Sequence, residues 1–272
     1  MFKKKYDLAF GVGAACSCTQ VLRAAGLQYL SFPFDWVFGA TIEDRVDCIC
    51  EHFSEFLNIT DLEFLQVHPF NGKDIYVNKK TGIVFNHDFP SGIPLSQGLT
   101  GVKLKYDRRS ARLLSLIEKS NRILVLWVGH AETNEQNSTR KSSWKDAAEY
   151  IEGRLCRSFG DKFDLLLFQH KDGVRMDKRE LVRYSRRVTK VAFDFKSKKM
   201  DAPGYAINTQ SLVRLLKKRF RVKDYRTDAE KNAYTSKNIC SSKKSKNRVW
   251  GIWNGVLNLI QRLCGIKGGD VK

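Results

Sequence analysis

The chain has 272 residues, of which 42% are hydrophobic and 28% are charged, and its formal net charge is +19. This composition excludes an intrinsically disordered chain and favours one folded α/β domain with a small appendage. Seven scattered cysteines, with no secretory signal before the first predicted strand, predict the reducing cytoplasm. No window reaches the roughly 18 apolar residues of a membrane-spanning helix.

The first predicted strand, residues 6–10, leads through Gly11 and Gly13 into a helix that opens near Cys16. A helix N-terminus presents unpaired backbone N–H groups and the positive end of the helix dipole, and both favour a thiolate. The same donors can hold an oxyanion. Cys16 is therefore the predicted nucleophile, and the alternative is a small buried thiol in a tight turn.

Apolar strands alternate with amphipathic helices along the rest of the chain. The predicted elements are a helix at 41–57, a hairpin of 74–77 and 82–86, a helix at 102–120, a strand at 122–128, a helix from 142 to 159 capped by Ser142 or Ser143, strands at 163–168 and 188–195, and a helix at 209–220. The alternation predicts an α/β domain, with a mainly parallel central sheet flanked by helices. An α+β arrangement is the alternative. The predicted domain spans 1–220, followed by a basic linker at 221–247.

Basic residues concentrate toward the C-terminus, where Arg214 to Arg248 carries thirteen Lys or Arg against three acidic residues. Such a segment attracts polyanions, or is simply a solvated tail. The final part, 248–272, contains an apolar stripe with two tryptophans. We expect an amphipathic helix that lies on an anionic membrane surface, or one that docks on the domain. The first option predicts a peripheral location at the inner membrane.

Thiol catalysis also needs a base and a group that orients the base. His87, at the end of the predicted hairpin, is the candidate base, and its alternative is a strand-end histidine that caps a loop. Asp35, Asp88 and Asn86 are candidates for orienting it. Neighbours on a strand point to opposite faces, so Asp35 is favoured over Asp88 and Asn86.

Further polar residues are candidates for substrate binding. His130 and His170 follow apolar strands, and ligands bind at the carboxyl ends of parallel strands, although ordinary strand-end histidines occur there too. Arg108 and Arg109 can clamp a carboxylate or phosphate, or form a solvated helix face. The closely spaced cysteine pairs do not match zinc ligands, and no glycine-rich cofactor motif is complete. The sequence predicts neither a metal nor a cofactor.

Residues 13–109 contain a run of motifs that occur together in a known family. They are Gly13, Cys16, Leu22, Arg23, Pro33-Phe-Asp-Trp36, His87-Asp88 and Arg108-Arg109. This pattern resembles a bacterial domain-of-unknown-function family of papain-like cysteine peptidases, over roughly residues 5–195, with Val12 replacing the usual Leu. The resemblance implies a papain-like layered domain with Cys16 and His87 as catalytic residues. It keeps Asp88 a candidate beside Asp35, and adds Arg23 and Trp36 as substrate-binding candidates.

We expect a cysteine-dependent hydrolase or acyltransferase in which Cys16 attacks an acyl carbonyl and His87 carries the proton. Members of the resembled family accompany glycosyltransferases in surface-polysaccharide loci, which implies an acyl-bearing glycan, lipid-linked or peptide substrate. The alternative is a non-catalytic basic scaffold for nucleic acid, acidic glycan or anionic membrane. The chain lacks a nucleic-acid-binding motif, which disfavours the first of these partners. The sequence predicts no particular oligomeric state.

Overall fold

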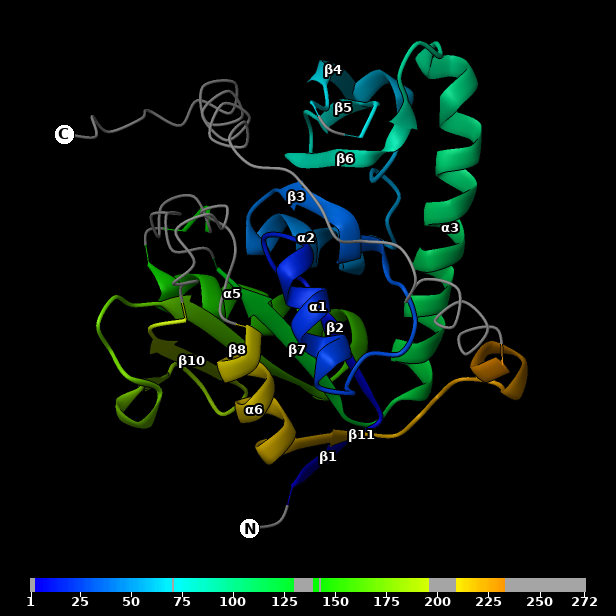
Figure 1. The fold of residues 1–272 in the computed structure, drawn as a ribbon. Helices are drawn as coiled ribbons and strands as arrows, with labels where there is room; N and C mark the ends of the chain where they lie inside the picture. The colour runs from blue at the N-terminus through cyan, green and yellow to red at the C-terminus, as the bar shows by residue number, and fades with distance from the viewer. Residues whose placement is uncertain (1–2, 70, 130–138, 142, 196–208, 233–272) are drawn as a thin grey trace, which may run out of the picture.

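The computed structural model describes residues 3–69, 71–129, 139–141, 143–195 and 209–232. Its described elements form a layered α/β domain with a smaller antiparallel sheet beside it (Figure 1). This confirms the predicted fold class. The predicted C-terminal helix at 248–272, the linker beyond residue 232 and His130 lie outside the described residues.

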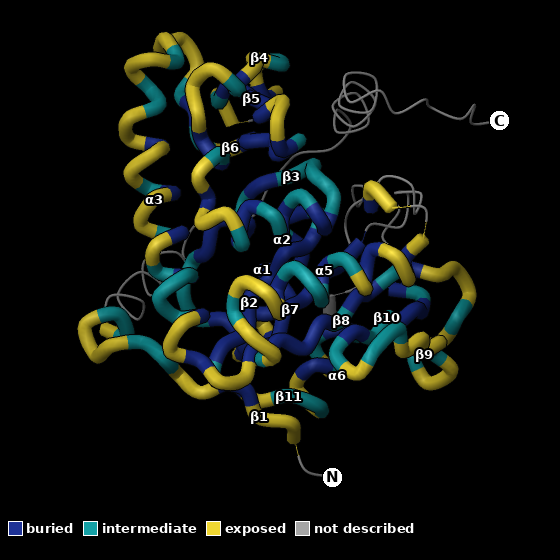
Figure 2. The backbone as a smooth tube through the Cα atoms, turned by 180° about the vertical axis from the view of Figure 1, so that it is seen from behind, coloured by how far each residue is buried: buried dark blue, intermediate teal, exposed yellow. Residues whose placement is uncertain are grey.

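The central sheet has five strands in the order β2-β7-β8-β10-β9. β2 (Leu8–Gly11), β7 (Ile123–Val128), β8 (Phe163–His170) and β10 (Val188–Phe193) run parallel, and β9 (Glu180–Arg183) is an antiparallel edge strand. The sheet is therefore mainly parallel, as the sequence predicts. Figure 2 shows the inner strands buried and β9 exposed at the edge.

Alternating residues of the buried strands face two separate hydrophobic clusters. Ile123, Val125 and Trp127 of β7 pack in the larger cluster with α2 (Ile42–Cys50), α3 (Leu95–Lys119) and α5 (Trp144–Phe159). Leu124 and Leu126 pack in the other cluster, with α1 (Cys16–Ala24) and α6 (Thr209–Arg219). The period of two in a strand thus places helices on both faces of the sheet.

The smaller sheet has the order β3-β6-β5-β4 and is antiparallel. Its strands are β3 (Val37–Gly39), β4 (Leu62–Val67), β5 (Lys73–Asn78) and β6 (Ile83–Pro90). The pairing of β5 with β6 confirms the predicted hairpin. β6 extends past the predicted end of its strand, so His87 lies inside the strand. Two short 3₁₀ turns, η1 (Pro33–Trp36) and η2 (Ile59–Asp61), precede β3 and β4.

Two predicted helix boundaries are wrong. α2 ends at Cys50, well before residue 57, because His52 and Phe53 adopt positive φ angles of 53° and 62° and break the helical path. α3 begins at Leu95, a full two turns before the predicted start. Ser143 caps α5 by accepting a hydrogen bond from the Asp146 backbone N–H, which settles the choice between the two serines.

The folded domain continues past the predicted boundary at residue 220. β11 (Phe220–Val222) pairs in parallel with β1 (Lys4–Tyr6), so the two ends of the domain lie side by side (Figure 1). The hydroxyl of Tyr225 then accepts a hydrogen bond from the Tyr29 backbone N–H. A third turn, η3 (Met176–Lys178), connects β8 to β9.

Candidate active site

Cys16 is the first residue of α1, directly after the turn that leaves β2. Its side chain is half-buried, whereas that of Cys18 is buried in the hydrophobic cluster. Gly13 makes this turn tight: a Cβ at this position would lie 2.5 Å from the Cβ of Cys18. The glycine therefore allows the strand and the helix to approach closely and sets the position of Cys16.

Burial and the start of α1 act in opposite directions on the pKa of the Cys16 thiol. Burial raises the pKa of the Cys16 thiol above its ordinary value of 9.0, and the backbone N–H groups of Cys16 and Ser17 only partly offset this effect. Burial disfavours the charged form of any thiol, and here it outweighs the helix N-terminus. Burial therefore favours the neutral thiol of Cys16, whereas the helix N-terminus alone favours the thiolate. Burial also raises the pKa of Cys18, to about 12.

Asp35 is fully buried at the centre of η1. Its carboxylate accepts hydrogen bonds from Thr19 Oγ1 at 3.0 Å, Arg23 Nη2 at 3.1 Å, Gln28 Nε2 at 2.9 Å and the Phe32 N–H at 3.0 Å. None of these hydrogen bonds reaches His87. The Asp35 carboxylate instead holds α1 against η1.

The helix residues that bind Asp35 lie on the same face of α1 as Cys16. Residues three or seven positions apart lie on the same face of a helix. Cys16 is therefore on the face of α1 from which Thr19 and Arg23 extend toward η1. η1 contacts β6 as well as α1. The antiparallel pair Val37 and Phe85 sets the register between β3 and β6, which places His87 at the level of η1. The two elements that carry Cys16 and His87, α1 and β6, therefore both contact η1.

His87 is solvent-exposed, and its imidazole packs 6.3 Å from the ring of Phe38 and 5.9 Å from that of His68, measured between ring centres. Its partly desolvated position lowers its pKa below the ordinary 6.5, an effect that Asp88 opposes and Lys105 reinforces. The ring is consequently neutral at pH 7, the state required of a general base. Both residues are described, and no hydrogen bond joins Cys16 to His87.

Asp88 points to the opposite side of β6 from His87, as strand geometry predicts. Its carboxylate accepts a hydrogen bond from Tyr106 Oη at 2.8 Å and forms an ion pair with Lys105. Both partners belong to α3. Asp88 therefore fastens β6 to α3, and its hydrogen bonds do not include His87.

The side chain of Asn71, which no sequence motif singles out, lies within hydrogen-bond distance of the His87 imidazole. Its Nδ2 lies 3.1 Å from His87 Nδ1 and 3.1 Å from the carbonyl oxygen of Asn86. Its Oδ1 accepts the Lys73 N–H at 3.0 Å, which fixes the orientation of the amide. The amide thus donates to Nδ1, and the proton of the neutral ring sits on Nε2. The Asn-Gly pair is a turn signal in the sequence, but nothing in its spacing points to His87.

His170 has both ring nitrogens occupied. The Phe195 N–H donates to its Nδ1 at 3.2 Å, and its Nε2 donates to Asp172 Oδ1 at 2.8 Å. With its side chain only 2% exposed, it is a satisfied histidine at the end of β8. This arrangement leaves no nitrogen for proton transfer in the observed state.

The predicted substrate-binding residues divide into two groups. Arg23 lies beside η1, with its guanidinium 5.8 Å from the ring centre of Trp36. Arg109 packs over Tyr106 at 5.4 Å, and its Nη1 is buried without a hydrogen-bond partner in the described structure. Arg108 is exposed and has no hydrogen bond or ion pair to the described residues. The fold therefore brings Arg23 and Trp36 together at η1, packs Arg109 against Tyr106 within α3 and leaves Arg108 at the surface.

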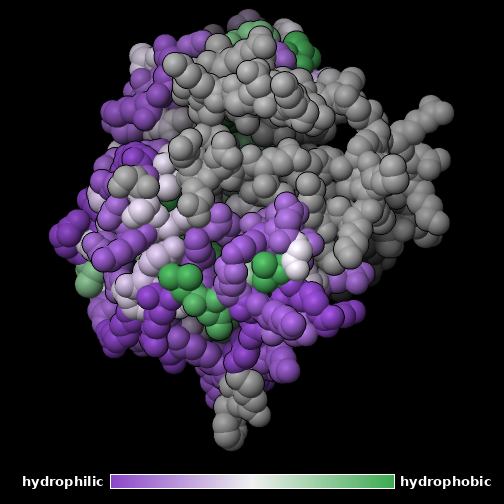
Figure 3. Space-filling model, turned by 90° about the vertical axis from the view of Figure 1, so that its left-hand side faces the viewer, coloured by the Kyte–Doolittle hydropathy of each residue, from purple (hydrophilic) through white to green (hydrophobic). Residues whose placement is uncertain are grey.

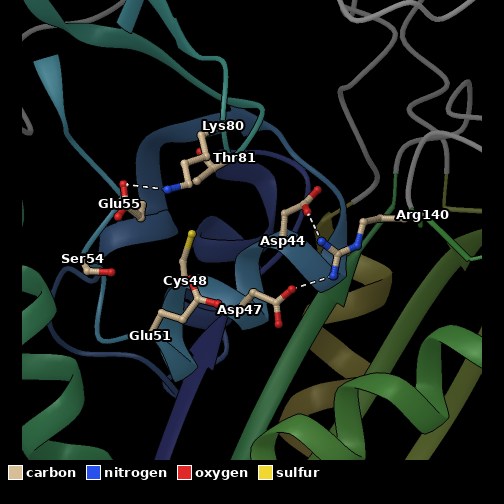
Figure 4. Close-up of a pocket in the computed structure, with 9 residues that line it drawn as sticks. All are labelled: Asp44, Asp47, Cys48, Glu51, Ser54, Glu55, Lys80, Thr81 and Arg140. Carbon is tan, nitrogen blue, oxygen red and sulfur yellow. Dashed lines mark hydrogen bonds and ion pairs between the residues drawn. The ribbon is translucent and has the colours of Figure 1, made fainter. Parts of the chain in front are cut away.

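A cavity of about 140 Å³ lies away from these residues, between α2 and the β5–β6 turn (Figure 4). The guanidinium of Arg140 reaches into it and bonds Asp44 at 2.7 Å and Asp47 at 2.6 Å. Arg154 binds Asp47 as well, at 2.8 Å. These ion pairs connect α2 to α5 and to residue 140, so we assign the cavity a structural role.

The described residues contain no cluster of three His, Cys, Asp or Glu side chains that could hold a metal ion. Among their helices, none is both long enough and apolar enough to cross a membrane. The described surface seen in Figure 3 is mainly hydrophilic.

Comparison with known proteins connects this site to a family. No curated protein and no solved structure matches the chain. One family model does match, over residues 7–171, which is more than half of the chain and includes the β2–α1 turn, η1 and the β5–β6 hairpin. By this match the chain belongs to the family described as "Putative papain-like cysteine peptidase (DUF1796)".

Proposed function

We propose that this protein is a cysteine-dependent hydrolase of the peptidase type, in which Cys16 is the nucleophile and His87 carries the proton. The observation that carries the proposal is the position of Cys16, a half-buried thiol on the first turn of α1, at the end of a strand of the parallel sheet. Ligands bind at this edge of α/β sheets, and the free N–H groups of the helix can hold an oxyanion.

The proposed reaction starts from a neutral thiol and a neutral imidazole. His87 takes the proton as the sulfur attacks the acyl carbonyl, and the carbonyl oxygen becomes an oxyanion next to the first N–H groups of α1. The leaving group then departs with the proton from His87. Water, activated by the same imidazole, attacks the thioester carbonyl and releases the acid together with Cys16.

The hydrogen bond from Asn71 defines a requirement of this reaction. While His87 Nδ1 accepts from Asn71 and Nε2 holds the proton, neither nitrogen can accept a proton from Cys16. The transfer requires the Asn71 contact to open, or the amide to turn and accept a proton from Nδ1. We therefore include Asn71 as a positioning residue.

We propose in addition an acyl acceptor and a location for this protein. The acyl acceptor in the second step is water in a hydrolase and a hydroxyl in a transferase. Transfer on a glycan or lipid-linked intermediate, as in surface-polysaccharide biosynthesis, fits the family context inferred from the motifs.

The net charge of +19 favours binding to an anionic membrane surface from the cytoplasmic side. Deletion of residues 248–272 tests the location: the full chain should co-sediment with anionic vesicles, and the truncated chain should not.

A labelling experiment tests the catalytic core of the proposal. Among the five cysteines that the structure describes, Cys156 is the exposed one, so of these it should react first with iodoacetamide, a probe that reports access and thiolate content. An acylating probe such as an activated thioester should instead mark Cys16, because that reaction uses the base and the oxyanion site. Peptide mass mapping distinguishes the two sites.

The controls for this experiment are Cys156→Ser and His87→Ala. Cys156→Ser should leave the rate of Cys16 acylation unchanged. His87→Ala should slow acylation of Cys16 by about 100-fold, as expected for loss of a general base. The proposed pair of Cys16 and His87 would be refuted if the most exposed cysteine were acylated fastest. It would also be refuted if Cys16 were acylated at the original rate in His87→Ala.

A further inference from the structure

The segment that joins α1 to η1 brings two arginines together on one serine. Arg23 Nη2 donates to Ser31 Oγ at 2.8 Å, and Arg112 Nη1 donates to the Ser31 carbonyl oxygen at 3.2 Å. Arg23 comes from the last turn of α1 and Arg112 from the middle of α3. Two guanidinium groups thus converge from separate helices, and all three residues retain partial solvent exposure.

A third arginine extends this group along α3. Arg109 precedes Arg112 by three residues, so the two side chains are neighbours on the helix surface. Lys105, one turn earlier, is already paired with Asp88. Arg109 and Arg112, by contrast, form no ion pair with the described residues. The charges of Arg109 and Arg112 thus remain available to bind an anion.

The charge balance around Ser31 is positive. Arg23 is paired with Asp35, whereas Arg109 and Arg112 have no ion-pair partner among the described residues, so the three guanidinium groups and this one carboxylate sum to a net charge of +2. Arg23 Nε and Arg109 Nη1 are also buried donors without a hydrogen-bond partner in the described structure. A buried donor that lacks an acceptor is costly, and such donors point to an absent acceptor.

We infer that Arg23, Arg109 and Arg112 bind a phosphoryl group of the substrate, an inference that rests on the proposed function of Cys16. Guanidinium groups bind phosphate oxygens in pairs, and a phosphate monoester carries about −1.5 to −2 charges at pH 7, which matches the local excess. A carboxylate carries half that charge. Seven residues separate Cys16 from Arg23 along α1, so the phosphoryl group lies about 10 Å from the reacting carbonyl carbon.

Inorganic phosphate is the first probe, because its binding requires no catalysis. Calorimetry at constant ionic strength on the full chain should detect saturable binding, and Cys16→Ser should bind equally well. Arg109→Gln should weaken binding at least about tenfold, as expected for loss of a charged hydrogen-bond donor. Arg112→Gln should weaken binding to the same extent. Of the two variants, Arg109→Gln is expected to keep the fold, because the Nη1 atom of Arg109 makes no hydrogen bond in the described structure. Arg108→Gln, one residue away and exposed, is the matched control and should change nothing.

The second probe distinguishes a substrate group from free phosphate. Two acylating probes are compared on Cys16, one with a phosphoryl group about 10 Å from its carbonyl carbon and one with a neutral hydroxyl there. The phosphorylated probe should acylate wild type at least about tenfold faster, and Arg109→Gln should remove this advantage. Equal rates would show that any phosphate bound there is not part of the substrate. Absence of phosphate binding, or an equal loss in Arg108→Gln, would overturn the site while leaving the role of Cys16 intact.

Discussion

The amide of Asn71 donates a hydrogen bond to Nδ1 of His87 across 3.1 Å, and two backbone groups hold the amide in this orientation. These are the Lys73 N–H, which bonds Oδ1, and the Asn86 carbonyl, which accepts from Nδ2. The tautomer of the candidate base is thus set by a loop residue. In this arrangement His87 displays an N–H, not a lone pair, on its second nitrogen.

Replacing Asn71 by Asp should activate the site. A carboxylate accepts a proton from Nδ1, which leaves the Nε2 lone pair free to take the proton of Cys16. We expect acylation of Cys16 in Asn71→Asp to be at least about tenfold faster than in wild type, measured with an activated thioester. Asn71→Ala removes the contact without reversing it, so its rate should lie between the two. A slower reaction in Asn71→Asp than in Asn71→Ala would contradict the assigned tautomer.

The pH dependence of acylation should form a broad plateau. The reactive state pairs a neutral Cys16, whose pKa lies above 9.0, with a neutral His87, whose pKa lies below 6.5. The second-order rate constant should therefore stay level between about pH 6.5 and 9 and fall only where His87 gains a proton, at lower pH. His87→Ala should lose the plateau and instead rise with pH as the thiolate forms. A decline between pH 7 and 9 in wild type would indicate an ion pair instead.

Removal of the Asp35 carboxylate should destabilise the domain. Asp35→Ala leaves Thr19, Arg23 and Gln28 without their shared acceptor, at a cost of about 3–5 kcal/mol in the free energy of unfolding. Asp35→Asn retains part of the network and should cost about 1–3 kcal/mol. Urea unfolding measures both. Asp107→Ala, an exposed carboxylate paired with Lys103, should change stability by less than about 1 kcal/mol. A similar loss in all three variants would remove the special role of Asp35.

The turn before Cys16 should not tolerate a side chain at Gly13. An alanine Cβ there would meet the Cys18 Cβ at 2.5 Å and the Val128 backbone nitrogen at 3.1 Å. Gly13→Ala should cost about 1–3 kcal/mol in unfolding free energy and displace the start of α1, which lowers the acylation rate of Cys16. Gly101→Ala is the control, since no heavy atom lies within 4 Å of a Cβ at that helical position. It should stabilise the protein by about 0.5–1 kcal/mol.

Local sequence patterns accounted for most of the framework. The alternation of Ile123 to Val128 follows from a strand with two buried faces, and the two clusters on the two sides of β7 confirm it. The opposite directions of His87 and Asp88 follow from the same period of two. Helix ends were less predictable, because the positive φ angles that end α2 belong to His52 and Phe53, two residue types without a strong turn preference.

By itself, the sequence determined the α/β class, the thiol at a strand-to-helix turn and the family motifs, since each depends on residues close together in the chain. Only the tertiary structure decided what those groups do to one another. Asn71 reaches His87 across a hairpin, Arg112 reaches Ser31 across 81 positions, and burial at the start of α1 raises the pKa of Cys16. The physical reason is that hydrogen-bond partners and desolvation depend on distances in space, and residues far apart in sequence set those distances.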